Sequence, residues 1–261
     1  MHRNVRYAFI LAGIFVLILS AGFSLEWPIV ISLWPWTDSH LSYVFIASIL
    51  AAAAVPIIWI GLSAESGAVV GGGLNLCLMS GATAVYLVQL YAVRSEQPLL
   101  VTAIVFAFFA LLSAAVLLWG LRHPIHDLRP VPAPVRVSFA AFTAVLILVG
   151  LALVLKASVI FPWPLNPDSS VIFGWVFLGA ALYFLYGILR PAWHNARGQL
   201  MGFLAYDLIL VGPFLAHFAD VKQEYLLSLI LYLIVIFYSG ALAVYYLLLN
   251  QQTRTWLAPS Q

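Results

Sequence analysis

Residues Leu121–Arg136 read Leu-Arg-His-Pro-Ile-His-Asp-Leu-Arg-Pro-Val-Pro-Ala-Pro-Val-Arg and divide the chain near its middle. This stretch is polar and rich in proline, whereas the sequence on either side of it is almost continuously apolar. Similar sequence features occur in the same order before and after it. We therefore expect a proline-rich connector at 122–136 between two related units, 1–121 and 137–261.

The amino-acid composition indicates an integral membrane protein. Of the 261 residues, 64% are hydrophobic and only 8% are charged, and the mean hydropathy is +1.07. Soluble domains carry about 25% charged residues, so this chain could not cover a water-exposed surface. The formal net charge of +2 is small and scattered. We therefore expect the lipid bilayer as a partner, and no nucleic acid.

Eight apolar runs are long enough to span a bilayer. About 20 residues of helix cross the hydrocarbon core. Backbone amides facing lipid must be paired within their own element, which favours helices and predicts an all-α membrane fold. The eight predicted spans are 7–25, 41–62, 67–92, 99–120, 137–156, 170–189, 199–219 and 225–248.

The basic residues predict an orientation. Cytoplasmic loops are enriched in Lys and Arg. If the N-terminus is cytoplasmic, eight of the 11 basic residues fall on the inside, and only Arg94, Lys156 and Lys222 fall on the outside. We therefore expect both termini and the connector to be cytoplasmic, with the protein in the inner (cytoplasmic) membrane of a bacterium.

Several features recur after the connector and indicate a tandem repeat of two four-helix units. An even number of spans per unit makes both copies cross the membrane in the same direction. We therefore expect a parallel pseudo-twofold axis along the membrane normal rather than an inverted repeat. The paired features are Val5-Arg6 with Val135-Arg136, the loop 34–39 with the loop 163–169, and Gly67-x-x-x-Gly71 with Gly198-x-x-x-Gly202.

The repeated outer loop begins with Trp-Pro in both copies and ends in Asp-Ser. It resembles the Trp-Pro-x-x-x-Pro loop before a span in uncharacterised bacterial polytopic membrane proteins. The resemblance covers the loop and the following helix, and it implies no activity. The loop residues selected as candidates are Trp34, Pro35 and Asp38 in the first copy and Trp163, Pro164 and Asp168 in the second.

Asp207 is the ionisable residue that we expect deep in the bilayer. It lies about nine residues into its span, or roughly 13 Å at 1.5 Å per residue. Intramembrane acids are costly and are candidates for function. Asn75 lies near the equivalent position of the first unit. Two hypotheses stay open: an Asn75–Asp207 hydrogen bond between facing spans, or a proton or ion role for Asp207.

Glycines and histidines provide further candidates. The motif glycines Gly67, Gly71, Gly198 and Gly202 predict close helix packing. His40 and His217, at outer helix ends, could hold a haem or metal, but interfacial polar residues explain them more simply. The pair His123 and His126 has no further ligand nearby, so we expect a solvated loop and no metal site there.

The sequence contains no recognisable catalytic motif, and its short loops leave no soluble catalytic domain. We therefore expect a non-catalytic multi-pass subunit or scaffold that packs against other membrane-protein subunits. The alternative is a transporter or channel for a small solute or ion that uses Asp207. A weaker alternative is the binding of a quinone, haem or pigment. Lipid is otherwise the only bound molecule expected.

Overall fold

The computed structural model describes residues 1–254, and its regular elements are helices. Eight of these helices are long and apolar enough to cross a membrane, which confirms the predicted multi-pass helical fold. Residues 255–261 of the predicted second unit lie outside the described residues. The eight helices are α1 (Arg3–Ser24), α3 (His40–Ser63), α4 (Val69–Arg94), α5 (Gln97–Gly120), α6 (Ala133–Val154), α7 (Pro167–Leu189), α8 (Trp193–Ala216) and α9 (Gln223–Val244).

Several helices begin before the apolar runs that predicted them. Helix α6 begins at Ala133, inside the predicted connector, and α8 begins at Trp193 rather than 199. Proline in the first turn of a helix is tolerated because the N–H that it lacks has no partner there anyway, so Pro134 does not prevent α6 from beginning at Ala133. Four short helical elements complete the fold: α2 (Pro28–Ile31), η1 (Ser66–Ala68), η2 (His217–Ala219) and the π-helix η3 (Tyr245–Leu249).

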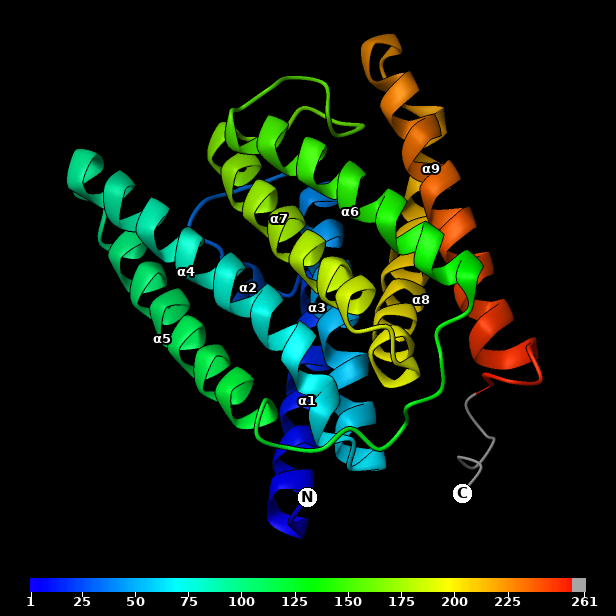
Figure 1. The fold of residues 1–261 in the computed structure, drawn as a ribbon. Coiled ribbons are helices and arrows are strands. Elements are labelled where there is room, and N and C mark those ends of the chain that lie inside the picture. Colours follow the sequence, from blue (N-terminus) through cyan, green and yellow to red (C-terminus); the bar gives the residue numbers. More distant parts are fainter. Residues whose placement is uncertain (255–261) are drawn as a thin grey trace.

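The long helices are arranged in four central and four peripheral positions. The central helices form two pairs, α3 with α8 and α4 with α7. Each peripheral helix packs mainly against one central helix: α1 against α3, α5 against α4, α6 against α7 and α9 against α8. Figure 1 shows the pair formed by α4 and α7 in front of α3 and α8. The two central pairs therefore make the main helix contacts between the first and second parts of the chain.

Glycines allow the peripheral helices to lie close to their central partners. In the contact of α6 with α7, a Cβ atom on Gly174 would lie 2.8 Å from the carbonyl oxygen of Gly150. In the contact of α1 with α3, a Cβ atom on Gly61 would lie 2.9 Å from the carbonyl oxygen of Arg6. In both contacts backbone therefore packs directly on backbone.

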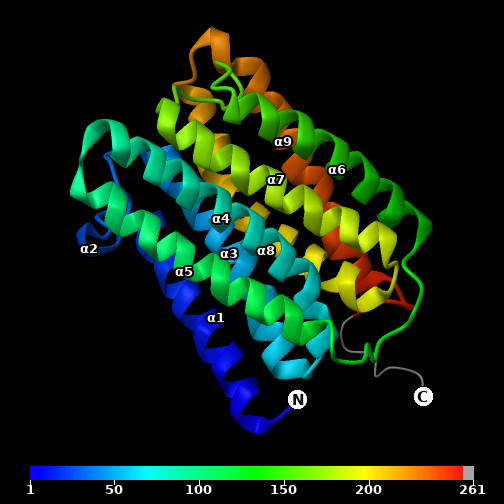
Figure 2. The same ribbon diagram turned by 60° about the vertical axis from the view of Figure 1, so that its left-hand side comes forward.

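The two ends of the bundle differ in charge. The connector between α5 and α6, the N-terminus and the C-terminal end of α9 lie at one end, which we call the connector face (Figures 1 and 2). The loops that join α1 to α3 and α6 to α7 lie at the opposite end, the loop face. By their places at the helix ends, the eight basic residues expected inside share the connector face. The cytoplasmic location of that face stays a prediction.

Candidate functional site

Asp207 is a residue of α8, and its side chain faces α9. Its side chain is almost fully buried, with the residue 5% exposed. The Oδ2 atom lies 2.8 Å from the hydroxyl oxygen of Ser239 on α9. Gly240 follows Ser239, and a Cβ atom there would lie 3.4 Å from the same carboxyl oxygen. The other carboxyl oxygen, Oδ1, is buried and has no hydrogen-bond partner.

Of the two hypotheses for Asp207, the hydrogen bond with Asn75 is wrong. Asn75 lies where α4 crosses α7, and a Cβ atom on Gly179 would lie 2.8 Å from its backbone carbonyl oxygen. The side-chain oxygen of Asn75 is buried without a hydrogen-bond partner. The physical reason lies in the pairing of the helices. Helix α4 packs on α5 and α7, and α8 packs on α3 and α9, so these two spans do not face each other as expected.

The motif glycines have different roles. Gly202 lies where α8 crosses α3, and a Cβ atom on it would lie 3.0 Å from the carbonyl oxygen of Ala52. Gly71 and Gly198 instead leave room for the ring of Tyr183 on α7, whose hydroxyl would lie 2.9 Å from a Cβ atom on Gly198. Gly202 is therefore the motif glycine that packs on the backbone of another helix.

The two Trp-Pro loops are hydrogen-bonded to each other's helices at the loop face. The indole N–H of Trp36 donates to the hydroxyl of Ser169 at 2.6 Å. The Ser169 hydroxyl also contacts the carboxylate of Asp38. In the opposite direction, the indole N–H of Trp163 donates to the hydroxyl of Ser42 at 3.0 Å. The predicted loop residues Asp38 and Trp163 are thus both used in contacts across the molecule.

The remaining predicted loop residues support these contacts or lie beside them. Trp34 stacks on Phe173 of α7, with ring centroids 6.0 Å apart. Pro35 and Pro164 each follow the tryptophan of their loop. Aromatic stacking at this depth adds apolar contact to the polar contacts of the loop face.

Asp168 is the centre of an ionic cluster at the loop face. It is buried, and its carboxylate accepts hydrogen bonds from the Tyr86 hydroxyl at 2.6 Å, Arg94 at 2.6 Å and Lys156 at 3.2 Å. Tyr86 and Arg94 belong to α4, whereas Lys156 follows α6. None of these three partners was predicted from the sequence. The available signal was that two of the three basic residues predicted on the outside lie near the same membrane surface as Asp168.

His40 and His217 have separate protein partners at the loop face. His40 pairs with Glu26, and the Nε2 atom of His217 lies 2.9 Å from the carbonyl oxygen of Pro162. Within residues 1–254, no group of three or more His, Cys, Asp or Glu side chains is arranged to hold a metal. The structure therefore gives these histidines hydrogen-bonding roles, and the weaker cofactor alternative stays a prediction.

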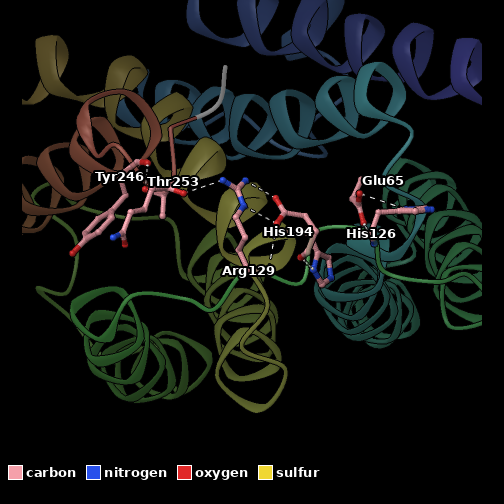
Figure 3. A network of polar contacts seen from close by, with 8 residues as sticks. Glu65, His126, Arg129, His194, Tyr246 and Thr253 are labelled. Carbon is pink, nitrogen blue, oxygen red and sulfur yellow. Dashed lines mark hydrogen bonds and ion pairs between the residues drawn. The ribbon is translucent and has the colours of Figure 1, made fainter. Parts of the chain in front are cut away.

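A polar network joins the connector to the helix ends at the connector face (Figure 3). Arg129 donates to Asp127 from Nε at 2.8 Å and from a terminal nitrogen at 2.6 Å. Its other terminal nitrogen donates to the carbonyl oxygen of Gln252 at 2.9 Å. The backbone N–H of His126 donates to Glu65, just before η1, at 2.9 Å. The connector is thereby fixed to both halves of the chain.

The electrostatics of this network favour charged side chains in Asp127 and Arg129. Burial by itself would raise the pKa of Asp127, but the hydrogen bonds and charge of Arg129 outweigh it and hold the pKa below its ordinary value. The same hydrogen bonds raise the pKa of Arg129. His194, in the first turn of α8, is fully buried, and its Nδ1 atom lies 3.3 Å from the carbonyl oxygen of Asp127.

A solvated loop was expected at His123 and His126, but the connector residues that follow them are partly buried. Asp127 and Val131 are both 6% exposed. The backbone holds this segment in place, because the N–H of Trp193 donates to the carbonyl oxygen of Arg129 at 2.8 Å. Ile125 of the connector also packs against Gly67, the remaining motif glycine. The high content of polar residues and proline indicated a loop, but could not indicate its burial against the helix ends.

The polar groups of the described residues thus gather at both membrane faces, with Asp207 between α8 and α9. No protein-family model matches the chain, and no curated protein or solved structure is significantly similar to it. The contacts described above are therefore the basis for any functional proposal.

Proposed function

We propose that the protein is a multi-pass membrane scaffold, a rigid unit of two halves that packs against other membrane-protein subunits. One observation carries the proposal: the halves are joined by hydrogen bonds at both faces. At the loop face, Trp36 donates to Ser169 and Trp163 donates to Ser42. At the connector face, the network of Figure 3 ties the connector to Glu65 on one side and to His194 on the other.

Joined faces favour a rigid unit over a moving one. A transporter that rocks one half against the other must break contacts at alternating faces in each cycle. Here such rocking would break hydrogen bonds at the loop face and at the connector face. The cost of leaving buried polar groups unpaired, about 1–3 kcal/mol for each group, opposes that motion.

We also infer that the halves are tandem copies related by a parallel pseudo-twofold axis. The helix pairing supports this inference. If α1, α3, α4 and α5 are exchanged for α6, α7, α8 and α9 in order, the pair α3–α8 becomes α7–α4, and α1–α3 becomes α6–α7. Each of these exchanged pairs exists in the structure.

The ends of the first helix of each half support the same inference. Helices α1 and α6 are each 22 residues long, and the second begins 130 residues after the first (133 − 3). Glu26 and Lys156, again 130 residues apart (156 − 26), both have positive φ, at 50° and 57°. Two helices that start and stop in the same way fit a duplicated unit.

The exposed face of α5 is a candidate surface for a partner subunit. Helix α5 packs on one long helix, α4, and its side chains Ile104, Phe108 and Leu111 are between 61% and 73% exposed. In a membrane this face contacts lipid or another helix. A partner helix would replace lipid on this face through van der Waals packing against these side chains.

The test compares α5 with another exposed face. We expect wild-type protein extracted gently from its native membrane to retain one membrane protein in constant ratio, measured by mass spectrometry of the purified complex. Phe108→Ala with Leu111→Ala should reduce that ratio. The matched variant Leu148→Ala with Leu151→Ala, on exposed α6, should leave it unchanged. A protein that leaves the native membrane alone would contradict the scaffold proposal.

A second candidate function is a transporter or channel for a small solute or ion. The specific observation that favours it is the buried, unpartnered Oδ1 atom of Asp207. Because Asp207 lies between α8 and α9, the pathway would run within the second half rather than between the halves. We expect proton or cation flux into proteoliposomes to be lost in Asp207→Asn. Wild-type flux equal to that of empty liposomes would contradict this candidate.

A further inference from the structure

The hydrogen-bond geometry of Ser239 indicates whether the carboxyl group of Asp207 carries a proton. The hydroxyl oxygen of Ser239 lies 2.8 Å from Oδ2 of Asp207, 2.7 Å from the backbone carbonyl oxygen of Val235 and, in a longer contact, 3.2 Å from that of Ile236. A serine hydroxyl has one proton to donate. The Val235 carbonyl can only accept, so the two short contacts compete for that proton unless Asp207 supplies one of its own.

The two ionisation states of Asp207 give different accounts of these contacts. If the carboxylate were ionised, the single hydroxyl proton would be shared between acceptors, and both short contacts would be weakened. If the carboxyl is protonated, Asp207 donates to Ser239, and Ser239 donates to Val235. Each contact then contains one proton, and the two hydrogen bonds polarise each other favourably.

The surroundings of Asp207 also fit a neutral acid. An ionised carboxylate needs partners for both of its oxygens, but Oδ1 is buried with none. The main helices packed on α8 carry no Lys or Arg, and the charged or titratable groups at their ends are His40 and Tyr43 on α3 and Glu224 and Tyr225 on α9. Helix α8 itself carries His194 and Arg197, which lie 13 and 10 residues before Asp207 (207 − 194 and 207 − 197), at the connector end of the helix. Tyrosine phenols, including Tyr206 and Tyr232, are the remaining titratable groups that face this region from α8 and α9.

A second contact in the protein has the same geometry, with a phenol in place of the carboxyl group. The hydroxyl of Ser138 lies 2.8 Å from the carbonyl oxygen of Pro134, four residues earlier, and 2.6 Å from the hydroxyl of Tyr238. Because Ser138 uses its own proton in donating to the Pro134 carbonyl, the tyrosine is the group that can supply the second proton. The carboxyl group of Asp207 occupies the place that the phenol of Tyr238 occupies in this other contact.

We infer that Asp207 is a proton-binding site inside the membrane, a neutral carboxylic acid that donates from Oδ2 to the hydroxyl of Ser239. Its ligand is a proton, and that proton is part of the contact between α8 and α9. Release of the proton would leave Ser239 between two acceptors and a charge between two apolar helices. This inference goes beyond the scaffold proposal and does not depend on it.

Infrared spectroscopy of the full-length protein in lipid nanodiscs tests the inference. With aspartate labelled with ¹³C at the side-chain carboxyl, we expect at neutral pH a carbonyl band of protonated aspartic acid that shifts with the label. Asp207→Asn should remove that band. The matched control is Asp168→Asn, which should leave the band unchanged. Asp168 is buried in ion pairs with Arg94 and Lys156, so its carboxylate should contribute no such band. The absence of a label-sensitive band in the wild type would overturn the inference.

A second variant keeps the inference testable if Asp207→Asn does not fold. Ser239→Ala removes the proposed acceptor but leaves the acid in place. We expect the band to persist in this variant and to move to higher frequency, because the carboxyl has lost its hydrogen bond. An unchanged band position in Ser239→Ala would show that Asp207 does not donate to Ser239, and would overturn the assignment.

Discussion

Asp127 and Arg129 show how single residues stabilise the connector face. The carboxylate is 6% exposed and accepts two hydrogen bonds from one guanidinium group, which is the strong, bidentate form of an ion pair. A buried ion pair contributes little relative to apolar residues, but removal of one partner leaves the other charge unpaired. The pair therefore holds the connector in one position.

Substitution of Asp127 tests this at the residue scale. We expect Asp127→Asn to lower the free energy of unfolding by about 3 kcal/mol at neutral pH, because Arg129 loses its counter-charge. Since the folded pKa of Asp127 lies below its unfolded value of about 3.9, the stabilisation is present above that value and is lost as the pH falls through the folded pKa.

The measurement is thermal unfolding in detergent at neutral and acidic pH. The difference between wild type and Asp127→Asn should shrink as the solution is acidified. Asp220→Asn provides a control, because Asp220 is exposed at the loop face and its substitution should change stability by less than about 0.5 kcal/mol. An equal difference at both pH values would contradict the role of the ion pair.

At the scale of elements, backbone contact between helices predicts opposite effects for two glycines. A Cβ atom on Gly174 would lie 2.8 Å from the Gly150 carbonyl oxygen, so Gly174→Ala must separate α6 from α7 and should cost about 1–3 kcal/mol. A Cβ atom on Gly72 would have no neighbouring atom within 4 Å, so Gly72→Ala should stabilise α4 by about 0.5–1 kcal/mol. Denaturant titrations in mixed micelles measure the change in unfolding free energy for each variant. Equal changes for the two variants would contradict the proposed role of backbone contact at Gly174.

The contacts between the two loops give a second prediction at this scale. Ser169→Ala removes the acceptor of Trp36 and the contact with Asp38, and should cost about 1–3 kcal/mol because polar groups lose their partners. Ser32→Ala is the control, because the Ser32 hydroxyl contacts only a carbonyl three residues earlier, on an exposed turn. Similar melting temperatures for the two variants would show that the loop contacts contribute little.

At the scale of the whole molecule, a fold in which all eight candidate helices cross the membrane predicts that the connector, the N-terminus and the end of α9 lie on one side of it. Basic residues gather on that side, which predicts that it is cytoplasmic. We expect Leu128→Cys, in the connector, to react with a membrane-impermeant thiol reagent only in opened cells, and Val159→Cys, at the loop face, to react in intact cells. Both side chains are exposed, at 70% and 41%.

This labelling requires a background without the native thiol, so Cys77→Ala is made first. The two sites should always react from opposite sides, whatever the orientation. Reaction of both sites from the same side would contradict the helix count, and reversed labelling would contradict only the cytoplasmic prediction.

The number of spans could be predicted because it depends on the transfer free energy of consecutive residues, which is a local property. Helix starts were harder to predict. Helix α8 begins at Trp193 with a polar first turn, whereas the apolar run that predicted the helix begins only at residue 199. The burial of Asp127 was equally invisible, because polar residues and proline describe a loop and not the surface that the loop packs on.

The sequence by itself determined that this is a multi-pass membrane protein with eight apolar helices, and how charge is distributed at their ends. Each of these properties follows from the chemistry of residues adjacent in the chain. Only the tertiary structure decided that Asp207 meets Ser239 rather than Asn75, and that Asp168 pairs with Arg94 and Lys156. The reason is that eight similar apolar helices can be neighbours in many arrangements, and shape complementarity between their side chains selects the one in which α3 packs on α8 and α4 on α7.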